Sequence, residues 1–390
     1  MGLELLFLLL PLAALSGYWL GRKRNVTLYK HSGHSEIPSD YLKGLNFLLN
    51  EQPDKAIEIF IQLLEVNSDT VETHLALGSL FRRRGEVDRA IRIHQNLIAR
   101  PTLNREQRAQ ALYDLGQDYM RAGLLDRAET LFTELIDTGP HTEHALWQLI
   151  DIYQTEKEWE KAIQTARRIE AKKNNDLSPI IAHYYCELAD TAIKNGEIAR
   201  GFKNLKKANM EDSNCVRISL IEGQTEKDSG NYKAAIRAFR RVEDQDQDFI
   251  PEIIEPLDTC YTAIGSSQEM QEYLQKIVAK TDGISAMLAL AKMIHQQQGE
   301  EAEIEFITEH LKQRPSVRGM DKMIELNLNL SKEGVKEKLH VLKHVTEKLL
   351  QDKPRYLCSS CGFSAMTIHW HCPSCKNWNT IKPIQGVEGE

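Results

Sequence analysis

The chain has few residues that break regular structure, and its cysteines are unevenly placed. It contains 12 Pro and 22 Gly among 390 residues, and four of its 7 Cys fall after residue 357. Such a low proline content excludes a collagen-like or proline-rich disordered chain. An odd cysteine count gathered at one end is not how a secreted disulfide scaffold is built. We therefore expect an ordered, mostly helical protein whose last four cysteines bind metal.

The sequence also lacks a strong excess of one charge and the motifs of common enzymes. Its net charge is −7, from 49 basic and 56 acidic residues that are interspersed along the chain. Without a field of one sign over the whole chain, broad binding to nucleic acid or anionic lipid is not expected. A Walker A loop, Gly-x-Ser-x-Gly and His-Glu-x-x-His are all missing from the sequence. These absences favour a binding protein over an enzyme.

One long run without charge stands near the N-terminus, at residues 5–21. As a helix these seventeen residues would span about 25 Å, at the short end of a bilayer crossing. Three basic residues at 22–24 follow the run, which is the reverse of a cleaved signal peptide. By the positive-inside rule, we expect residues 1–21 to be a transmembrane anchor with the rest of the chain in the cytoplasm. Residues 22–38 should form a cytoplasmic linker.

A pattern of small residues recurs along the middle of the chain. A small residue is followed twelve positions later by another, and often by an aromatic residue four positions beyond that. The copy that begins at Gly116 is nearly complete, with a turn glycine at Gly123, then Ala128 and Phe132. The register positions of the copies are Gly44, Gly78, Gly116, Ile150, Ala189 and Gly223. Successive copies are therefore 34, 38, 34, 39 and 34 residues apart.

These residues and this spacing resemble the tetratricopeptide repeat, in which two antiparallel helices cross closely. Small residues allow that crossing, the glycine makes the turn, and the aromatic residues fill the space between repeats. Loop-forming residues at 101–104 and 173–176 coincide with the two longer steps, so loops between repeats should hold the extra residues. The period continues weakly over 251–315, giving about eight helix pairs. We predict an all-α superhelix over residues 39–315, closed by capping helices at 316–352.

The first helices of such an array line a concave surface that in this repeat family binds peptides or partner helices. The repeat register places aromatic and basic residues on that surface, namely Arg82, Arg83, Tyr113, Arg121 and Trp147. Arginines beside aromatic rings would suit an acidic or amphipathic segment of a partner. An ordinary solvated face near helix ends is the alternative, and the sequence leaves both open.

The C-terminal part of the chain carries the strongest chemical signal. Cys358-x-x-Cys361 is followed, after ten intervening residues, by Cys372-x-x-Cys375. Each Cys-x-x-Cys turn directs two thiolates inward, and two facing turns build a tetrahedral four-sulfur site. We predict that residues 353–390 form a metal-binding module with these four cysteines as the ligands of one metal ion, either zinc or iron.

Two histidines, His369 and His371, are close enough in sequence to raise a mixed site, but four thiolates already complete the shell. A closed shell leaves no position for water or substrate, so hydrolytic metal catalysis is not expected. The turns look like rubredoxin knuckles and equally like zinc ribbons, so the sequence does not choose the metal. Four aromatic residues are expected to pack around the site: Tyr356, Phe363, Trp370 and Trp378.

The order of anchor, basic stop, repeats and four-cysteine module closely resembles the lipopolysaccharide assembly protein B family of Gram-negative bacteria. The resemblance covers essentially the whole chain and includes Cys372-Pro-Ser-Cys375-x-x-Trp378. It implies an inner-membrane adaptor that helps the membrane protease FtsH degrade the deacetylase committing precursor to lipid A. It further implies partners among lipid A and lipopolysaccharide biosynthesis or transport proteins, and Cys358, Cys361, Cys372 and Cys375 as metal ligands.

Three questions stay open at the level of sequence. An iron-loaded, rubredoxin-like module that passes electrons to a membrane enzyme is an alternative function. Homo-oligomerisation is neither required nor excluded. A ribbon that binds nucleic acid is disfavoured, because few cations lie near the two cysteine turns.

Overall fold

The computed structural model of the chain describes residues 71–390 except 102, 174, 175 and 352, together with residues 42–44, 46, 47, 52, 55, 56 and 59. The expected transmembrane anchor at 1–21 and the linker at 22–38 lie outside the described residues. No helix in the described part of the chain is both long and apolar enough to cross a bilayer. Two compact units divide the chain, Met1–Ala145 and Leu146–Glu390.

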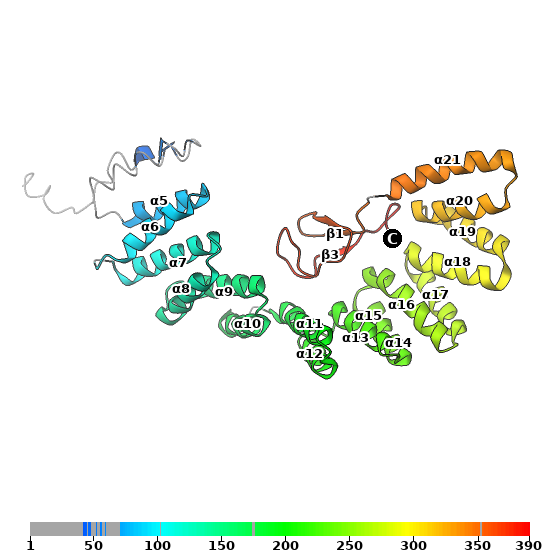
Figure 1. Cartoon of the computed structure of the whole chain (residues 1–390), viewed down its shortest axis with the longest axis horizontal. Helices are drawn as coiled ribbons and strands as arrows, with labels where there is room; N and C mark the ends of the chain where they lie inside the picture. The colour runs from blue at the N-terminus through cyan, green and yellow to red at the C-terminus, as the bar shows by residue number, and fades with distance from the viewer. Residues whose placement is uncertain are drawn as a thin grey trace, which may run out of the picture. The chain divides into compact units, whose positions relative to one another are not determined.

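The described part of the first unit consists of antiparallel helix pairs, coloured blue to blue-green in Figure 1. Its helices are α5 (Val71–Arg83), α6 (Val87–Ile98), α7 (Arg105–Arg121), α8 (Leu125–Thr138) and the start of α9 (Thr142–Glu156). Phe47 and Ala56 of the first sequence repeat pack into one apolar cluster with Phe81 and Ala90 of the next repeat. The first copy of the pattern thus stacks on the second, as the register predicts.

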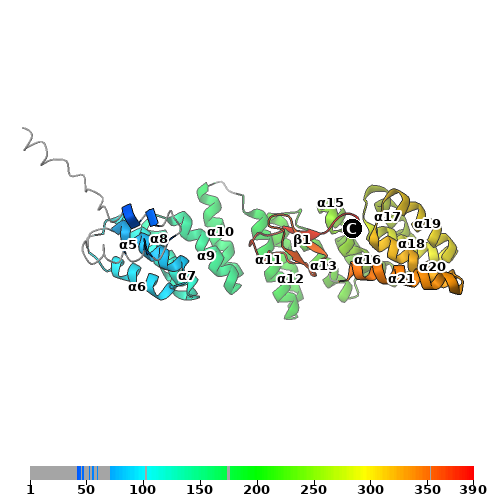
Figure 2. The ribbon, with the colours of Figure 1, turned by 90° about the horizontal axis from the view of Figure 1, so that it is seen from above.

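The second unit continues the pairs and ends in three short strands, which Figure 2 shows from above. Its helices after α9 are α10 (Trp159–Lys173), α11 (Ser178–Lys194), α12 (Ile198–Glu211), α13 (Val216–Asp228), α14 (Tyr232–Arg240), α15 (Val242–Gln245), η1 (Gln247–Phe249), α16 (Ile250–Ala263), α17 (Ser267–Lys280), α18 (Ile284–Gln298), α19 (Glu300–Gln313), α20 (Val317–Leu330) and α21 (Glu333–Leu350). Its strands are β1 (Tyr356–Cys358), β2 (Ser364–Ala365) and β3 (Ile381–Pro383).

Small residues lie where the two helices of a pair cross. A Cβ atom added at Gly116 would come within 2.6 Å of the Phe132 ring, and one at Gly223 would come equally close to the Phe239 ring. No real Cβ contact is that short, so a larger side chain would push the helices apart. The glycine of the repeat register is therefore required by the packing, as predicted.

The turn inside most of the described helix pairs uses left-handed backbone. Gly123 has φ +73° between α7 and α8, which is the conformation that glycine adopts without strain. The corresponding position between α9 and α10 is Lys157, and it has φ 59°. The array thus keeps the same turn where the glycine is missing, at the conformational cost that a side chain brings.

The two longer sequence steps fall in loops between repeats, as predicted. One lies between the end of α6 at Ile98 and the start of α7 at Arg105, and the other lies between α10 and α11. Asn104 ends the first loop and caps α7, because its side chain accepts a hydrogen bond from the Gln107 N–H and Gln107 bonds back to the Asn104 N–H. The additional residues therefore leave the helix pairs themselves intact.

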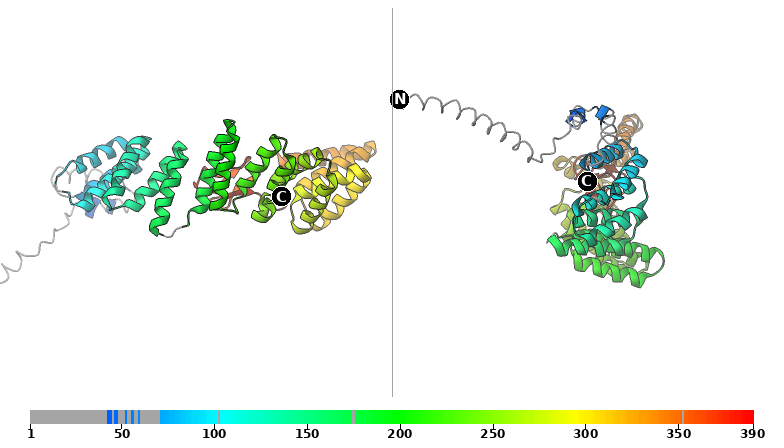
Figure 3. Two further views of the ribbon diagram at one scale, coloured as in Figure 1. Left: turned by 90° about the horizontal axis from the view of Figure 1, so that it is seen from below. Right: turned by 90° about the vertical axis from the view of Figure 1, so that its left-hand side faces the viewer.

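The strands form a small antiparallel sheet in the order β2-β1-β3. Tyr356 of β1 pairs with Ala365 of β2 on one side and with Pro383 of β3 on the other. In Figure 1 this sheet lies on the side of the second unit formed by the first helices of its pairs. The view from below in Figure 3 shows the green helices in front of the red strands. The C-terminal module is thus part of the second unit and packs against its repeats.

Candidate metal centre and its seat on the repeats

Two matching turns hold the four cysteines of the C-terminal module. The Gly362 N–H donates to the Cys358 carbonyl (2.9 Å), and the Lys376 N–H donates to the Cys372 carbonyl in the same way (3.0 Å). The residue after the second cysteine is left-handed in both turns, with φ 75° at Gly362 and 61° at Lys376. A search for glycine after Cys-x-x-Cys would therefore find only the first knuckle.

The sulfur atoms have the spacing of a tetrahedral metal site. All four Sγ atoms lie within 4.8 Å of one another. The Sγ atoms of Cys358 and Cys375 are 3.7 Å apart, and so are those of Cys361 and Cys372. Metal–sulfur bonds of about 2.3 Å in a tetrahedron place the sulfurs about 3.8 Å apart, whereas a disulfide would bring two of them to about 2.05 Å. A four-cysteine site that fits one zinc or iron ion is therefore present.

The protonation of the thiols differs across the site. A hydrogen bond to the Thr380 hydroxyl (Sγ to Oγ1, 3.3 Å) is the main factor that lowers the pKa of Cys358 to about 6. The backbone N–H of Asn377 lowers the pKa of Cys375, while burial raises that of Cys372 to about 11. Metal ligation needs thiolates. Two thiols are thus predisposed to bind, and the charge of the metal must stabilise the Cys372 thiolate.

The two nearby histidines have other partners. The Nε2 atom of His371 lies 2.8 Å from the Lys376 carbonyl oxygen, and its ring stacks on Trp378 with centroids 4.7 Å apart. His369 is exposed and contacts the Phe363 ring edge to face, with centroids 6.4 Å apart. Neither histidine belongs to the sulfur cluster of the described residues.

The Trp378 side chain projects from the metal module and packs against the repeats. Its indole N–H donates to Gln154 Oε1 of α9 over 2.7 Å. Its ring centroid lies 5.2 Å from that of His183 in a stacked contact, 5.6 Å from Tyr184 and 6.1 Å from Trp159. An aromatic cluster from α10 and α11 and an amide from α9 thus contact this side chain.

Trp370 makes a second insertion beside the first. It stacks on Phe249 (centroids 5.4 Å apart) and lies 5.9 Å from His183. The guanidinium of Arg217 lies over its ring at 5.8 Å and also bonds to Glu187 (2.8 Å) and Asp190 (2.6 Å) of α11. Trp370 therefore covers a buried arginine that pairs with two half-buried carboxylates of the repeats.

The expected aromatic shell around the metal site is only half correct. Tyr356 and Phe363 do pack with Cys358 and Cys372 in the core of the module. Trp370 instead packs against the repeat core, and Trp378 lies in the aromatic cluster of α10 and α11. Aromatic residues in so small a module can face either its own core or a neighbour, and spacing in the sequence does not distinguish the two.

Polar contacts extend the interface between the module and the repeats toward α16. The Lys382 ammonium bonds to Asp246 (2.9 Å), which precedes the short helix η1, and to Asp248 (2.8 Å), which lies within it. The Tyr356 hydroxyl donates to Glu252 Oε1 over 2.6 Å. With Trp370 and Trp378, these bonds attach the module to α9, α11, α13 and α16.

The end of the chain is attached further along the array. The Glu390 carboxylate accepts hydrogen bonds from the Ser285 N–H (3.0 Å) and hydroxyl (2.7 Å) at the start of α18. It also pairs with Arg318 of α20. The Val317 N–H donates to the Val387 carbonyl over 2.9 Å. The module and its tail together therefore contact helices from α9 to α20.

The comparisons with known proteins agree with this architecture. A model described as rubredoxin metal binding domain matches residues 356–383, and models described as tetratricopeptide repeat match residues 73–109 and 113–176. Lipopolysaccharide assembly protein B of Escherichia coli strain K12 is 44% identical over 389 residues, covering 99% of this chain and 100% of that protein. The chain belongs to the lipopolysaccharide assembly protein B family. The Haemophilus influenzae protein of that name is 34% identical over 396 residues and is covered to 99%, as is this chain.

Solved structures similar to this member of the lipopolysaccharide assembly protein B family include that of MamA. It is 22% identical, with 44% of this chain and 94% of that chain covered and a TM-score of 0.33. A tetratricopeptide repeat protein from Parabacteroides merdae is 15% identical, with 79% and 97% covered and a TM-score of 0.29.

Among the predicted partner-binding residues of this lipopolysaccharide assembly protein B family member, Arg82 has the most contacts. Its guanidinium bonds to Asp114 (2.9 Å) and Asp118 (2.8 Å) of α7, and only 16% of its side chain is exposed. Asp118 in turn bonds to the buried His94 ring over 2.5 Å. Arg82 thus ties α5 to α7, and a partner would meet only its exposed fraction.

Tyr113 lies in an aromatic group of the first unit. Its ring stacks on His141 and meets His144 edge to face, with centroids 5.9 Å apart in each case. Arg83 and Arg121 are exposed at the C-terminal ends of α5 and α7, and Trp147 is half-buried in α9. The structure therefore gathers Arg82, Arg83, Tyr113 and Arg121 on α5 and α7, and their contact with a partner stays a prediction.

Proposed function

We propose that this protein is a non-enzymatic adaptor of lipopolysaccharide synthesis, held at the bacterial inner membrane, which promotes degradation of the lipid A-committing deacetylase by FtsH. Its relatives named lipopolysaccharide assembly protein B support the pathway. The observation that supports the adaptor role most directly is the packing of the metal module against the repeats. The module connects the repeats of the second unit to one another. Its four-thiolate site would be filled by the cysteines, which leaves no ligand position for a substrate.

The metal has a structural role in this proposal. Cys358, Cys361, Cys372 and Cys375 would hold the ion, whose chemistry is to bind four thiolates and so connect the two knuckles. A module of this size buries too little apolar surface to fold alone, so metal binding supplies its stability. The folded module then presents Trp370 to the repeats.

A client is expected to bind where the module does not. Contacts at His183, Arg217 and Glu252 show that the first helices α11, α13 and α16 are already covered by the chain's own C-terminal part. The face formed by α5 and α7 carries Tyr113 with exposed arginines at the helix ends. An acidic or amphipathic segment of the client would suit that face.

The proposed anchor at residues 1–21 acts through concentration. Tethering the repeats at the membrane surface by the linker at 22–38 raises the effective concentration of membrane-bound partners such as FtsH. Deleting residues 1–21 should therefore move the protein from the membrane fraction to the soluble fraction and slow degradation of the deacetylase, even though the repeats stay folded.

The direct experiment is a degradation assay with FtsH in membranes, purified deacetylase and the full-length chain. Wild-type protein should accelerate loss of the deacetylase, and the double substitution Arg83→Glu with Arg121→Glu should abolish most of that acceleration. Arg168→Glu, a charge reversal on the exposed side of α10, is the matched control and should behave as wild type. Unchanged degradation with and without the chain would refute the adaptor role.

Metal exchange tests the electron-transfer alternative in the same assay. An adaptor needs only a folded module, so protein loaded with zinc alone should be as active as protein loaded with iron. Activity that requires iron and follows its reversible reduction would instead support electron transfer.

A further inference from the structure

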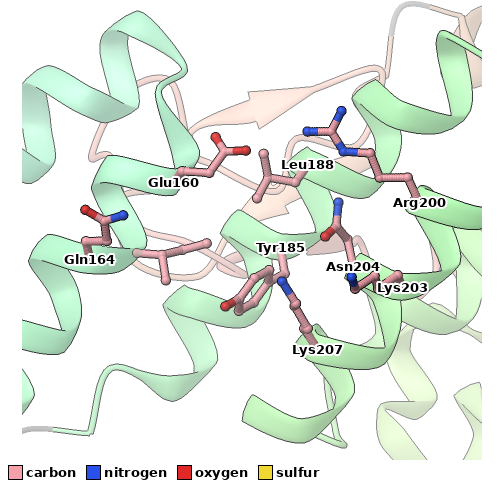
Figure 4. A pocket seen from close by; sticks show the side chains of 9 residues that line it. Glu160, Gln164, Tyr185, Leu188, Arg200, Lys203, Asn204 and Lys207 are labelled. Carbon is pink, nitrogen blue, oxygen red and sulfur yellow. The ribbon is translucent and has the colours of Figure 1, made fainter. Parts of the chain in front are cut away.

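An open pocket lies between α10, α11 and α12, apart from the metal module (Figure 4). Its volume is about 310 Å³. One wall is a stripe of α12 that contains Arg200, Lys203, Asn204 and Lys207. Residues spaced by three, four and seven share one face of a helix. The regular spacing thus places three cations and one amide around a single cavity.

Asn204 is the polar group at the centre of this stripe. The residue is only 7% exposed, and the exposed part includes its amide, which is not among the buried side-chain atoms without a partner in the described chain. Since Asn204 lines the pocket and its amide is directed toward the labelled cations in Figure 4, a ligand in the pocket could replace the water that bonds to this amide.

The other walls provide shape and little compensating charge. Ile163 of α10 and Leu188 of α11 are apolar, and Glu160 is the one acidic residue in the lining. An ion pair between Arg167 and Glu211 joins α10 to α12, so two walls are connected to each other. The pocket is therefore positively charged overall, with an apolar part beside the charge.

The cations are accessible to a ligand. Lys203 is exposed and has no ion pair among the described residues, and the Lys207 ammonium lies over the Tyr185 ring at 5.4 Å. Arg200 pairs with Glu197 over 3.0 Å, but both side chains are about half exposed, at 60% and 49%. Exposed pairs of this kind are weak and exchange readily for a stronger partner.

We propose that this pocket binds a phosphate group, either as the free anion or as a monoester. A phosphate group carries nearly two negative charges and three acceptor oxygens, which match three cations and a buried amide better than a single carboxylate does. The apolar wall at Ile163 and Leu188 would contact the organic part of the ligand. The same chemistry could be met by free phosphate or by a small phosphorylated metabolite, and binding data distinguish the two.

The test is calorimetric titration of the full-length protein at constant ionic strength with inorganic phosphate, glucose 1-phosphate and glucose. Saturable binding of either phosphate compound, and none of glucose, is expected. Tighter binding of glucose 1-phosphate than of phosphate would assign the pocket to a phosphorylated metabolite, and equal binding would assign it to phosphate itself. Absence of saturation by both up to concentrations on the order of 10 mM would overturn the proposal.

Variants locate the binding at this pocket. Lys203→Met combined with Lys207→Met should weaken phosphate binding about tenfold, because each exposed charge pair contributes a factor of about two to five. Asn204→Leu, which keeps the side-chain size, should weaken it by a similar factor. Lys206→Met removes an exposed cation from the neighbouring face of α12 and should leave the affinity unchanged. Equal losses in the double variant and in Lys206→Met would contradict a built site and indicate diffuse charge attraction.

Discussion

The first helices of the two units are held together by opposite means. In the first unit, Arg82 of α5 bonds to Asp114 and Asp118 of α7, so charges join neighbouring repeats. In the second unit, the rings of Trp370 and Trp378 reach the repeats from the C-terminal module. Both units use the same helix pairs. The repeat scaffold therefore leaves its inner face free to be fixed by local charges or by a distant part of the same chain.

The two units also differ in the residue that faces the register glycine inside a helix pair. Gly116 and Gly223 each face a phenylalanine ring across the helix crossing, whereas Gly78 faces His94. The His94 ring bonds to Asp118, and its Nε2 atom is buried with no hydrogen-bond partner in the described chain. A polar ring at an aromatic position thus brings the charge network of the first unit into its core.

Removal of the metal should produce the largest difference between the two regions. We expect Cys372→Ser to lose bound metal and unfold the module, because structural four-ligand sites contribute on the order of 10 kcal/mol. Trp370 and Trp378 would then become solvated, and their fluorescence would shift to longer wavelength. The described helices of the first unit, where Arg82 bonds to Asp114 and Asp118, should keep their protection against proteolysis.

Cys260→Ser is the matched control for that experiment. Cys260 is a buried free thiol in α16, outside the sulfur cluster. The control should retain one metal ion per chain in elemental analysis. A Cys372→Ser protein with native metal content and unshifted tryptophan emission would show that the four-thiolate assignment is wrong.

Arg82→Met should damage the first region and spare the second. The substitution leaves Asp114 and Asp118 buried without their cation, and breaking a buried pair in this way costs about 3–5 kcal/mol. Hydrogen exchange should accelerate in α5 to α8, while α11 to α16 keep their protection. Arg83→Met, an exposed neighbour, should change stability by less than about 0.5 kcal/mol. Similar exchange in both variants would mean that the charges do not hold α5 on α7.

Acid should loosen the second region through His183. Burial lowers the pKa of His183 to about 3, and the nearby Arg217 and His371 charges add to the effect. The unfolded chain therefore takes up the proton first, so this contribution to stability is complete above about pH 6.5 and falls by about 1.4 kcal/mol per pH unit below it. Thermal unfolding of the second unit should lose about 2 kcal/mol between pH 6.5 and 5.

His183→Phe should remove that slope, since the ring stays between the two tryptophans without a titrating group. His144→Phe is the control, because His144 is exposed in the first unit, and this variant should keep the wild-type slope. Identical slopes in all three proteins would assign the acid sensitivity to other groups.

The smallest expected effect comes from a single hydrogen bond between the module and the repeats. Tyr356→Phe keeps the ring in the module core but removes the hydrogen bond to Glu252, which should cost about 1 kcal/mol. Chemical denaturation that reports on the second unit would measure it. Tyr232→Phe, whose hydroxyl makes no hydrogen bond within the described residues, is the control and should be neutral. A neutral Tyr356→Phe would indicate that the rings alone hold the module.

Much of the repeat architecture follows from local requirements and could be predicted. Only a small residue fits at Gly116 or Gly223, and only loop residues fit between α6 and α7. The four-sulfur cluster is equally local, because two Cys-x-x-Cys turns need only a short hairpin to meet. The left-handed Lys157 and Lys376 escaped prediction, because the backbone there is set by the surrounding turn rather than by the residue.

The position at which the module packs against the repeats could not be predicted, and the reason is different. Trp378 and Gln154 are separated by 224 positions in the chain. The direction of Trp370 depends on which of two apolar surfaces is larger once the repeats are stacked. Asn204 was also missed, because a polar residue on a helix with many lysines gives no sign that it will be buried. Contacts between distant segments carry no periodic pattern to detect.

Repeat proteins commonly gain or lose a repeat by duplication or deletion, since each repeat contacts only its neighbours. The C-terminal module changes that rule for this chain. It bonds to Gln154, to Glu252 and, through Glu390, to Arg318 at the same time. One repeat more or less between α9 and α20 would separate these partners by the width of a helix pair. The module therefore constrains the number of repeats in this stretch, because it can reach all three partners only at the present length of the array.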